Sequence, residues 1–298
     1  VKDGKNVRMG WFVRNTIWLM SRIQRTGVQT PRISAPVPGP EWSGLDPYMA
    51  GLLLGDGTLS TRTATLYTSD KEIEDYAVSS GWSLGDYGRS ANQLWPTRAA
   101  SLAWQNFLGR HKREHKRIPE TLLLAEPSTR LAVLQGLLDS DGSIEERGAI
   151  SFSNTSLYLM KGVQYIVRSL GGKATFAWQD RPDGIAHRNG LGGRYKMNIN
   201  MPNGVVPFRL TRKASRVKTK DISLNRAIVD IQPAGKGEAV CFAVAHPAQQ
   251  FVIDGFVVTH NTDCQLMFFR KYVGLGYGGY WKGVIFDRGY KNLDDLIG

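Results

Sequence analysis

Two aspartates, Asp56 and Asp141, end two stretches of the chain that repeat one another. Residues 49–57 read MAGLLLGDG and residues 134–142 read LQGLLDSDG, so that a glycine follows each aspartate. Two adjacent carboxylates repel one another and favour a cation, and hard oxygen ligands suit Mg²⁺. Such an ion can generate a hydroxide nucleophile and stabilise the leaving oxygen of a phosphodiester. The pair therefore predicts a metal-dependent nuclease site.

Each stretch has the composition of a helix with small residues four apart. These small residues are Gly51 and Gly55 in the first copy and Gly136 and Ser140 in the second. This spacing allows two helix backbones to approach closely, so we expect the helices to pack side by side. Asp56 and Asp141 would then meet at the C-terminal ends. The alternative is two ordinary helices whose terminal aspartates cap them and face water.

Capping signals bound both predicted helices. Asp46 can accept from free amides, Pro47 suits the first helical position, and Gly57 is predicted to end the helix in a left-handed conformation. The corresponding residues of the second copy are Ser128 or Thr129 at the start and Gly142 at the end.

The composition fits a protein that binds a polyanion. The 298 residues contain 38 Lys and Arg against 26 Asp and Glu, which gives a net charge of +12, and 42% of them are hydrophobic. These values fit a polyanionic partner and a sizeable core, while no run is long enough to predict a membrane span. The two cysteines lack metal-binding spacing, and no signal peptide is evident, so we expect a reduced, cytoplasmic location in a bacterial or phage-infected cell.

The repeated motif resembles that of the LAGLIDADG (dodecapeptide) homing endonucleases, in the form where one chain supplies both halves of the site. The first copy departs from the motif name at Leu54 and Gly55, and only the final aspartate is required by the chemistry. The resemblance implies a monomer and a lysine near the scissile phosphate, which falls on Lys116 in its Lys-X-Ile-Pro setting and on Lys213 in the second half. The alternative role for either lysine is contact with the phosphate backbone.

An internal duplication supports two similar halves within residues 45–226. Each motif helix is followed by a β-rich run and a second helix, predicted at 72–80 and 157–170, that ends at a glycine. We therefore predict an α+β fold with a pseudo-two-fold axis, two central motif helices and antiparallel sheets, which the resemblance places in the DNA major groove. Strands are expected within 61–69, 82–89, 174–181 and 194–201. Candidate DNA contacts are Arg110, Lys112, Arg113, Arg181, Arg194, Lys196 and Arg212. His111 and His115 are four residues apart, but with no third ligand they are interpreted as DNA-facing side chains.

The region from 227 to 261 resembles the C-terminal part of an intein, the all-β Hint splicing domain. Two β-rich runs with a turn at Asp254-Gly255 lead to His260, Asn261 and Thr262. The resemblance implies that Asn261 cyclises and cleaves the bond to Thr262, that His260 assists, and that the Thr262 hydroxyl takes the acyl group beforehand. Cys241 is placed where related inteins have a catalytic residue, and a buried structural cysteine is an equal alternative.

The two ends complete the predicted organisation. Residues 1–44 are interpreted as the remnant of an N-terminal splicing region, with a hairpin turn at 3–6 and a proline-rich connector at 31–40; a complementary N-terminal intein fragment would be needed for splicing. Residues 262–298 resemble a phage terminase large subunit after its phosphate-binding loop. The predicted function is Mg²⁺-dependent, site-specific double-strand cleavage by an intein-borne endonuclease. The alternative is an eroded, DNA-binding intein whose remaining chemistry is C-terminal cleavage or splicing.

Overall fold

The computed structural model describes residues 2–3, 6–7, 29–33, 35–86, 91–180, 192–218, 225–232, 244 and 250–260. The chain divides into two compact units. The larger comprises Pro31–Arg226 with Asp254–Val257, and the other comprises Val1–Thr30, Ala227–Ile253 and Val258–Gly298. Within the described ranges, no helix has the length and apolar character needed to cross a membrane.

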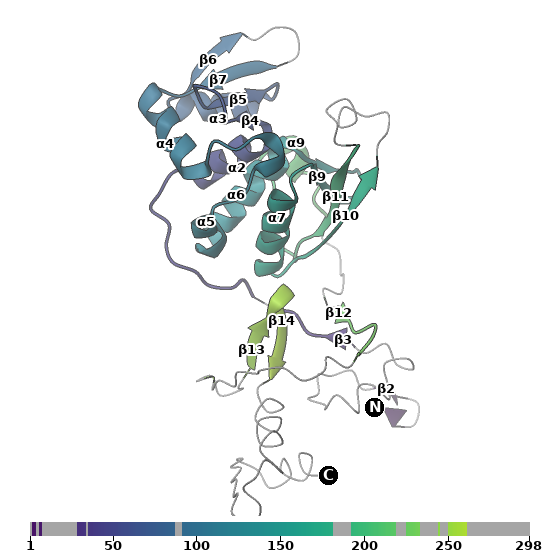
Figure 1. The fold of residues 1–298 in the computed structure, drawn as a ribbon. Coiled ribbons are helices and arrows are strands. Elements are labelled where there is room, and N and C mark those ends of the chain that lie inside the picture. The colour runs from purple at the N-terminus through teal and green to yellow at the C-terminus, as the bar shows by residue number, and fades with distance from the viewer. Residues whose placement is uncertain are drawn as a thin grey trace, which may run out of the picture. The chain divides into compact units, whose positions relative to one another are not determined.

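The first half of the larger unit is a helix followed by a four-stranded antiparallel sheet with helices around it (Figure 1). Its elements are α2 (Pro47–Asp56), β4 (Gly57–Thr58), β5 (Thr65–Thr68), α3 (Lys71–Ser79), β6 (Ser83–Asp86), β7 (Asn92–Trp95), α4 (Arg98–Leu108), η1 (Arg113–His115) and α5 (Glu120–Leu124). The sheet order is β4-β5-β7-β6. Helix α3 packs against this sheet.

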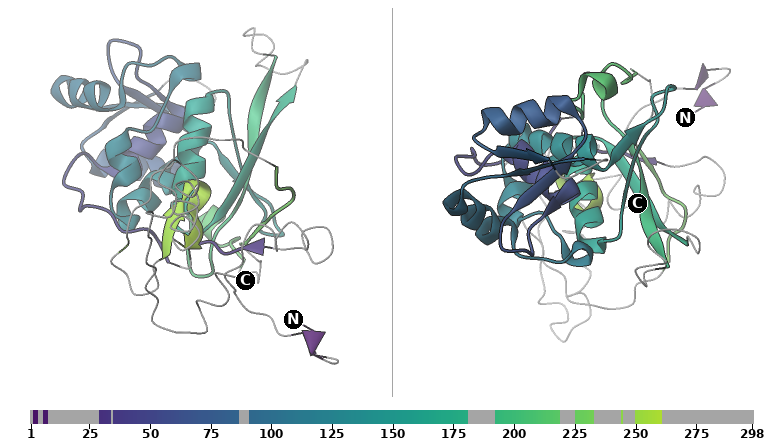
Figure 2. Two further views of the ribbon diagram at one scale, coloured as in Figure 1. Left: turned by 60° about the horizontal axis from the view of Figure 1, so that its bottom comes forward. Right: turned by 90° about the horizontal axis from the view of Figure 1, so that it is seen from above.

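The second half repeats this order with longer strands. Its elements are α6 (Pro127–Ser140), β8 (Gly142–Ile144), β9 (Ile150–Asn154), α7 (Leu157–Ser169), β10 (Lys173–Asp180), β11 (Gly193–Asn200) and α9 (Thr211–Ala214). The sheet order is β10-β11-β9-β8, and every pairing in it is antiparallel. Helix α7 packs on this sheet, whose long green strands stand out in Figure 2. The predicted duplication and the mixture of helices with antiparallel sheets are therefore confirmed.

The two motif helices pack backbone to backbone. A Cβ atom added to Gly136 would lie 2.2 Å from the Tyr48 carbonyl oxygen and 2.9 Å from the Gly51 Cα, so neither helix has room for a side chain here. Around this contact, leucines of both helices are fully buried in one core that extends into both halves. The predicted small-residue interface is thus confirmed, and it holds α2 and α6 in register.

The helix ends differ in part from the sequence expectations. Asp46 caps α2 as predicted and accepts from the Tyr48 amide at 2.9 Å, but α6 begins at Pro127 after Glu126, before Ser128 and Thr129. The left-handed stop predicted at Gly57 is wrong: its φ is −92° and its ψ 158°. Each motif helix runs straight into a strand, so its glycine is extended. Position 57 has no room for a side chain, because an added Cβ at Gly57 would lie 2.4 Å from the Leu53 oxygen.

The proline-rich segment before α2 lies against the larger unit and is more than a connector. The Val37 amide donates to the Ser169 oxygen at 2.9 Å, and the Glu126 amide donates to the Pro40 oxygen at 2.9 Å. The fully buried Arg130 side chain also donates to the Val37 oxygen. The segment therefore joins the end of α7 to the start of α6.

Short strand pairs make up the rest of the described chain. Strands β1 (Lys2–Asp3) and β2 (Asn6–Val7) pair across the hairpin turn predicted at 3–6, and β3 (Gln29–Thr30) pairs with β12 (Arg226–Ala227). Strands β13 (Gln250–Ile253) and β14 (Val257–His260) pair around η2 (Asp254–Phe256). Gly255 has a φ of 73°, which confirms the turn predicted at Asp254-Gly255. The predicted domain boundaries and the Hint assignment stay predictions.

Candidate active site and nucleic-acid interface

The structure brings the two motif aspartates together. Asp56 is the last residue of α2, and Asp141 is the C-cap of α6. A Cβ atom added to Gly55 would lie 2.0 Å from the Ser140 Oγ and 3.8 Å from the Asp141 carboxyl carbon, so the two helix ends are in direct contact. The expected pairing of two carboxylates at one end of the helix pair is therefore present.

The environment of the pair favours its protonated form. Burial in the crowded site raises the pKa of Asp56 to about 6, and the negative charge of Asp141 is the second cause of this rise. The Asp56 side chain nevertheless remains accessible to solvent. Burial also raises the pKa of Asp141, opposed by the nearby positive charges and by the Asn154 side chain. The Asn154 amide donates to Asp141 Oδ2 at 3.2 Å and accepts from the Ser156 amide at 2.9 Å, which fixes its orientation. A cation bound here would stabilise the ionised form of both carboxyl groups.

Lys116 and Lys213 occupy equivalent positions in the two halves, and each binds the end of its own motif helix. Lys116 Nζ donates to the oxygens of Gly57 at 2.7 Å, Leu54 at 3.0 Å and Gly55 at 3.0 Å. Lys213 Nζ donates to the oxygens of Leu138 and Asp139 at 2.7 Å and of Gly142 at 2.8 Å. A cation at this position complements the negative end of the helix dipole.

This geometry bears on the role of the two lysines. Both are only 6% exposed, and each ammonium group has carbonyl acceptors for all three of its hydrogens. The alternative of a phosphate-backbone contact is therefore wrong, because the amines point into the protein. Burial lowers the pKa of each lysine to about 8, and the charge of each lowers the pKa of Asp56. Their catalytic assistance stays a prediction, and the charge they add beside the carboxylates is its physical basis.

Sequence reasoning missed the role of Asp139. This residue is 2% exposed, and its Oδ2 accepts from the Tyr48 hydroxyl at 2.9 Å and from the amides of Arg209 at 2.8 Å and Leu210 at 3.2 Å. Burial raises its pKa. The signal was present in the sequence, because Asp139 stands where the first copy has Leu54. A carboxylate at only one of two equivalent positions indicates a contact that only one half makes.

Arg212 lies in an ion pair between the halves. Its guanidinium is 2.7 Å from Asp70 Oδ2, and the neighbouring Thr211 hydroxyl donates to Glu72 Oε2 at 2.8 Å. Both carboxylates belong to the start of α3, in the first half. Asp70 offsets the charge of Arg212 in this ion pair, and the role of Arg212 as a DNA contact stays a prediction. Residues 209–213 join the second motif helix to the first half.

Polar side chains dominate one face of the second sheet. Strand register places Arg194 opposite Gln179, Lys196 opposite Ala177 and Ser153, and Asn198 opposite Thr175 and Ser151. The alternate residues Ala174, Met197 and Ile199 are buried in the core. Arg194 and Lys196, both predicted DNA contacts, therefore lie on the face away from the core. The second half therefore has the polar sheet face that was expected, and its contact with DNA stays a prediction.

Arg110, Lys112 and Arg113 lie in the exposed segment between α4 and the residue Lys116. All three are exposed, and the charge of Arg113 lowers the pKa of both Asp56 and Asp141. The His111 and His115 rings form no metal pair here: Arg117 Nε donates to His111 Nε2 at 3.2 Å. Over the described ranges, no group of three or more His, Cys, Asp or Glu could hold a metal ion.

Five predicted site residues fall wholly or partly outside the described residues. Strand β14 includes the backbone of His260, whose side chain lies outside the described part. The other four are Arg181, Cys241, Asn261 and Thr262. Their roles stay predictions.

Comparison with known proteins supports the motif assignment. Residues 128–186 match the model of a family described as a LAGLIDADG-like domain. The matched residues cover nearly all of α6 together with β8, β9, α7 and β10. A replicative DNA helicase DnaB from Mycobacterium intracellulare is 27% identical over 232 residues, which is 76% of this chain. The chain spans 36% of the length of that relative.

Solved structures of the homing endonuclease I-DmoI also resemble the chain. Its mesophilic variants are 16% identical, with a TM-score of 0.37 over 52% of this chain and 87% of the other. Its complex with DNA and calcium is 14% identical, with a TM-score of 0.39 over 57% of this chain and 94% of the other.

Proposed function

We propose that this chain is a metal-dependent DNA endonuclease of the homing type, in which one polypeptide supplies both halves of the site. The observation that carries the proposal is the pair Asp56 and Asp141 at the joined ends of two in-register helices. The matched lysine under each helix end shows that the two halves are built alike, and pseudo-symmetric halves suit cleavage of two antiparallel DNA strands. The LAGLIDADG-like domain at 128–186 supports the same class.

The donor set fits Mg²⁺. This ion is commonly bound by one or two carboxylates, waters and substrate phosphates, so two aspartates at an accessible site suffice. Asp56 and Asp141 would hold it, and when bound it would supply an activated water and charge stabilisation at the leaving oxygen. Asn154 orients the Asp141 carboxylate through its hydrogen bond. Lys116 and Lys213 hold the helix ends and lower the cost of keeping both aspartates ionised.

The sheet faces are the proposed contacts to double-stranded DNA. The polar face of β9, β10 and β11 carries Arg194, Lys196 and Asn198, types that bind base edges and phosphates. The net charge of +12 supports association with a polyanion. The first-half sheet is shorter, so we propose that the second half supplies more of the sequence-specific contacts.

Cleavage of DNA libraries tests the proposal. The full chain is incubated with Mg²⁺ and plasmids carrying intein-less host genes or a randomised insert, and cut ends are sequenced. We expect cuts at one site, lost in Asp56→Asn and in Asp141→Asn and retained in Glu146→Gln, an exposed carboxylate change outside the site. Specific binding without cleavage in the wild type would favour the eroded, DNA-binding alternative. Absence of both would refute the nuclease proposal.

A C-terminal splicing activity is a second proposal, supported by the hairpin of β13 and β14, which leads directly to Asn261 and Thr262. Cyclisation of Asn261 would release residues 262–298, which we propose are host protein of the terminase type, and splicing would need a complementary N-terminal intein fragment. Mass spectrometry of the purified chain tests this. Release of a fragment that begins at Thr262, lost in Asn261→Ala, is expected, and an intact chain after prolonged incubation with or without such a fragment would contradict it.

A further inference from the structure

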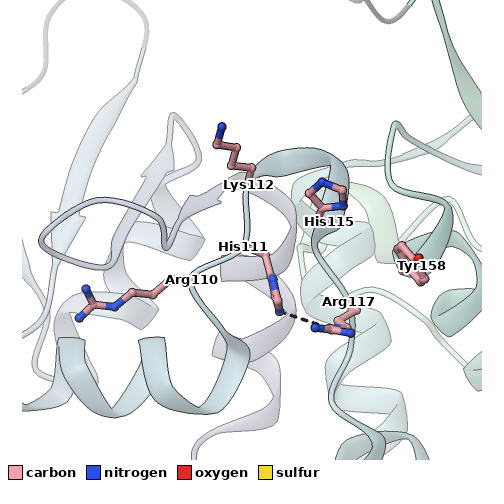
Figure 3. A pocket seen from close by; sticks show the side chains of 6 residues that line it. All are labelled: Arg110, His111, Lys112, His115, Arg117 and Tyr158. Carbon is pink, nitrogen blue, oxygen red and sulfur yellow. Dashed lines mark hydrogen bonds between the residues drawn. The ribbon is translucent and has the colours of Figure 1, made fainter.

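A basic cavity lies on the segment that also carries Lys116. Its volume is about 440 Å³, and it is lined by Arg110, His111, Lys112, His115, Arg117 and Tyr158. Figure 3 shows the His111 and Arg117 side chains pointing toward one another, with Arg110 directed away from them. Three of the six lining residues are permanent cations, two are histidines, and none is acidic. The cavity is therefore suited to an anion.

The cations of this cavity have little internal compensation. Within the described part of the chain, no salt bridge involves Arg110, Lys112 or Arg117. The nearest acidic contact is Glu114, whose Oε1 is 4.0 Å from His115 Nε2. Two other exposed cations of the unit are paired, Lys71 with Glu74 and Arg147 with Glu145. The three permanent cations that line this cavity repel one another, and the repulsion is relieved when an anion binds.

The donors of the cavity are of the types that bind phosphate. Arg117 uses its Nε on His111, which leaves its terminal guanidinium nitrogens for another acceptor. Because His111 Nε2 accepts that bond, the neutral ring carries its proton on Nδ1 and can donate it. Arginine binds phosphate through paired N–H groups, and lysine binds it as a point charge. The Tyr158 hydroxyl adds a neutral donor from the first turn of α7.

A chain of hydrogen bonds connects the segment that forms the cavity to the proposed catalytic carboxylates. Lys116, between His115 and Arg117, sends its ammonium group inward to the end of α2, and its own carbonyl accepts from Ser156 Oγ at 2.7 Å. Ser156 is the N-cap of α7 and also binds Asn154, which donates to Asp141. A phosphate in the cavity would therefore sit on the outer side of the same segment that holds the α2 end.

We propose that this cavity binds a phosphate group, and that in the protein–DNA complex it takes a backbone phosphate of the substrate. The second clause rests on the proposed nuclease function. A phosphate held here would fix the duplex relative to Asp56 and Asp141 without contacting the reacting atoms. A free phosphate or polyphosphate offers the same chemistry as a DNA backbone phosphate. The two experiments below distinguish these ligands.

Salt-dependent DNA binding tests the backbone source. The double variant Lys112→Ala, Arg117→Ala removes two exposed cations of the cavity, and Lys161→Ala, Arg98→Ala removes two exposed cations elsewhere. Binding of a non-specific duplex is followed by fluorescence anisotropy between low and high salt. For each DNA phosphate that the protein no longer binds, the slope of log K against log salt falls by about 0.9, which is about eightfold weaker binding at about 0.1 M salt. We expect this reduction in the cavity variant and not in the matched control.

Titration with inorganic phosphate and pyrophosphate tests the cavity by itself. The His111 and His115 ring resonances are expected to shift in the wild type and not in the cavity variant. A phosphate response with unchanged DNA binding would support a free phosphate ligand and refute the backbone assignment. Equal behaviour of both variants toward both probes would overturn the proposal even if the protein cuts DNA. If the cavity binds phosphate while the protein neither binds nor cuts DNA, the nuclease proposal fails and the cavity stands.

Discussion

Replacing Gly136 by alanine is the most direct test of the architecture. The added Cβ would lie 2.2 Å from the Tyr48 oxygen, 2.8 Å from the Leu52 nitrogen and 2.9 Å from the Gly51 Cα. The first distance is about 1.2 Å short of the 3.4 Å at which ordinary contact begins, and all three atoms are backbone. Overpacking of a core costs about 1–3 kcal/mol, and alanine recovers up to about 1 kcal/mol over glycine in a helix. Because backbone cannot rotate away, we expect a net loss of about 2 kcal/mol in the free energy of unfolding.

The same substitution should impair cleavage beyond its effect on stability. Helices forced apart by about 1 Å would misplace one carboxylate relative to the other, and a misplacement of this size costs on the order of 100-fold in rate. The assays are urea unfolding and single-turnover cleavage with folded protein.

Gly162→Ala is the matched control for this test. It lies inside α7, and the nearest atom to an added Cβ is the flexible Ile118 Cδ1 at 3.0 Å. Its unfolding free energy should stay within about 1 kcal/mol of the wild type, because the gain in helix propensity offsets a small movement of Ile118. If Gly136→Ala unfolds and cleaves like this control, the helices do not pack through the glycines and the reasoning is refuted.

Three further predictions follow from the groups around the carboxylates. In Lys213→Met, the α6 carbonyls lose their charged donor, so urea unfolding should show a loss of about 2 kcal/mol; wild-type stability would contradict the assigned contact. In Asp139→Leu, which copies the first half, the Tyr48 hydroxyl and two backbone amides lose their acceptor, and a loss of about 2–3 kcal/mol is expected by the same measurement, whereas a neutral result would mean that the segment 209–213 is held by other contacts. The pKa of Asp56 rises from 3.8 to about 6, so the folded state binds more protons than the unfolded state, and this contribution to stability is lost as pH rises through 6. Asp56→Asn should therefore unfold at higher urea than the wild type at pH 7 while it cleaves no DNA, and Mg²⁺-dependent cleavage by the wild type should decline as pH falls below about 6; an Asn variant no more stable than the wild type would contradict the assigned electrostatics.

The local elements could be predicted where the sequence repeats or carries strong end signals. The small residues of the motif helices define their contact, and Gly81 and Gly171, with φ of 82° and 85°, follow α3 and α7 as predicted. Helix α4 was missed because two of its four buried positions, Ser101 and Gln105, are polar. Their hydrogen bonds to residues 59–64 satisfy them, and these partners lie more than 35 positions earlier in the chain. A hydrophobic pattern cannot reveal a helix buried in this way.

The site was predictable in its carboxylates and not in their support. Asp56 and Asp141 could be recognised because each ends one of two similar stretches within the same sequence. The sequence motif located Lys116 but not its hydrogen-bond acceptors, which are carbonyl oxygens at the end of a helix about sixty residues earlier. From the sequence alone, a DNA phosphate was an equally good acceptor for this lysine. The ion pair of Arg212 with Asp70 likewise joins residues 142 positions apart. Charge in a sequence therefore indicates the chemistry available, and only the fold decides where it is used.

Because Gly51 contacts Gly136 directly, the spacing of the two carboxylates does not depend on the side chains of the outer sheet faces. The spacing of the carboxylates depends on main-chain atoms that meet directly, with no side chain between them. Substitutions on the outer faces of the sheets, such as at Lys196 or Asn198, leave that spacing alone. Under the proposed function, a lineage or an engineer can therefore replace the surface that would select a target sequence while the carboxylate pair remains as it is.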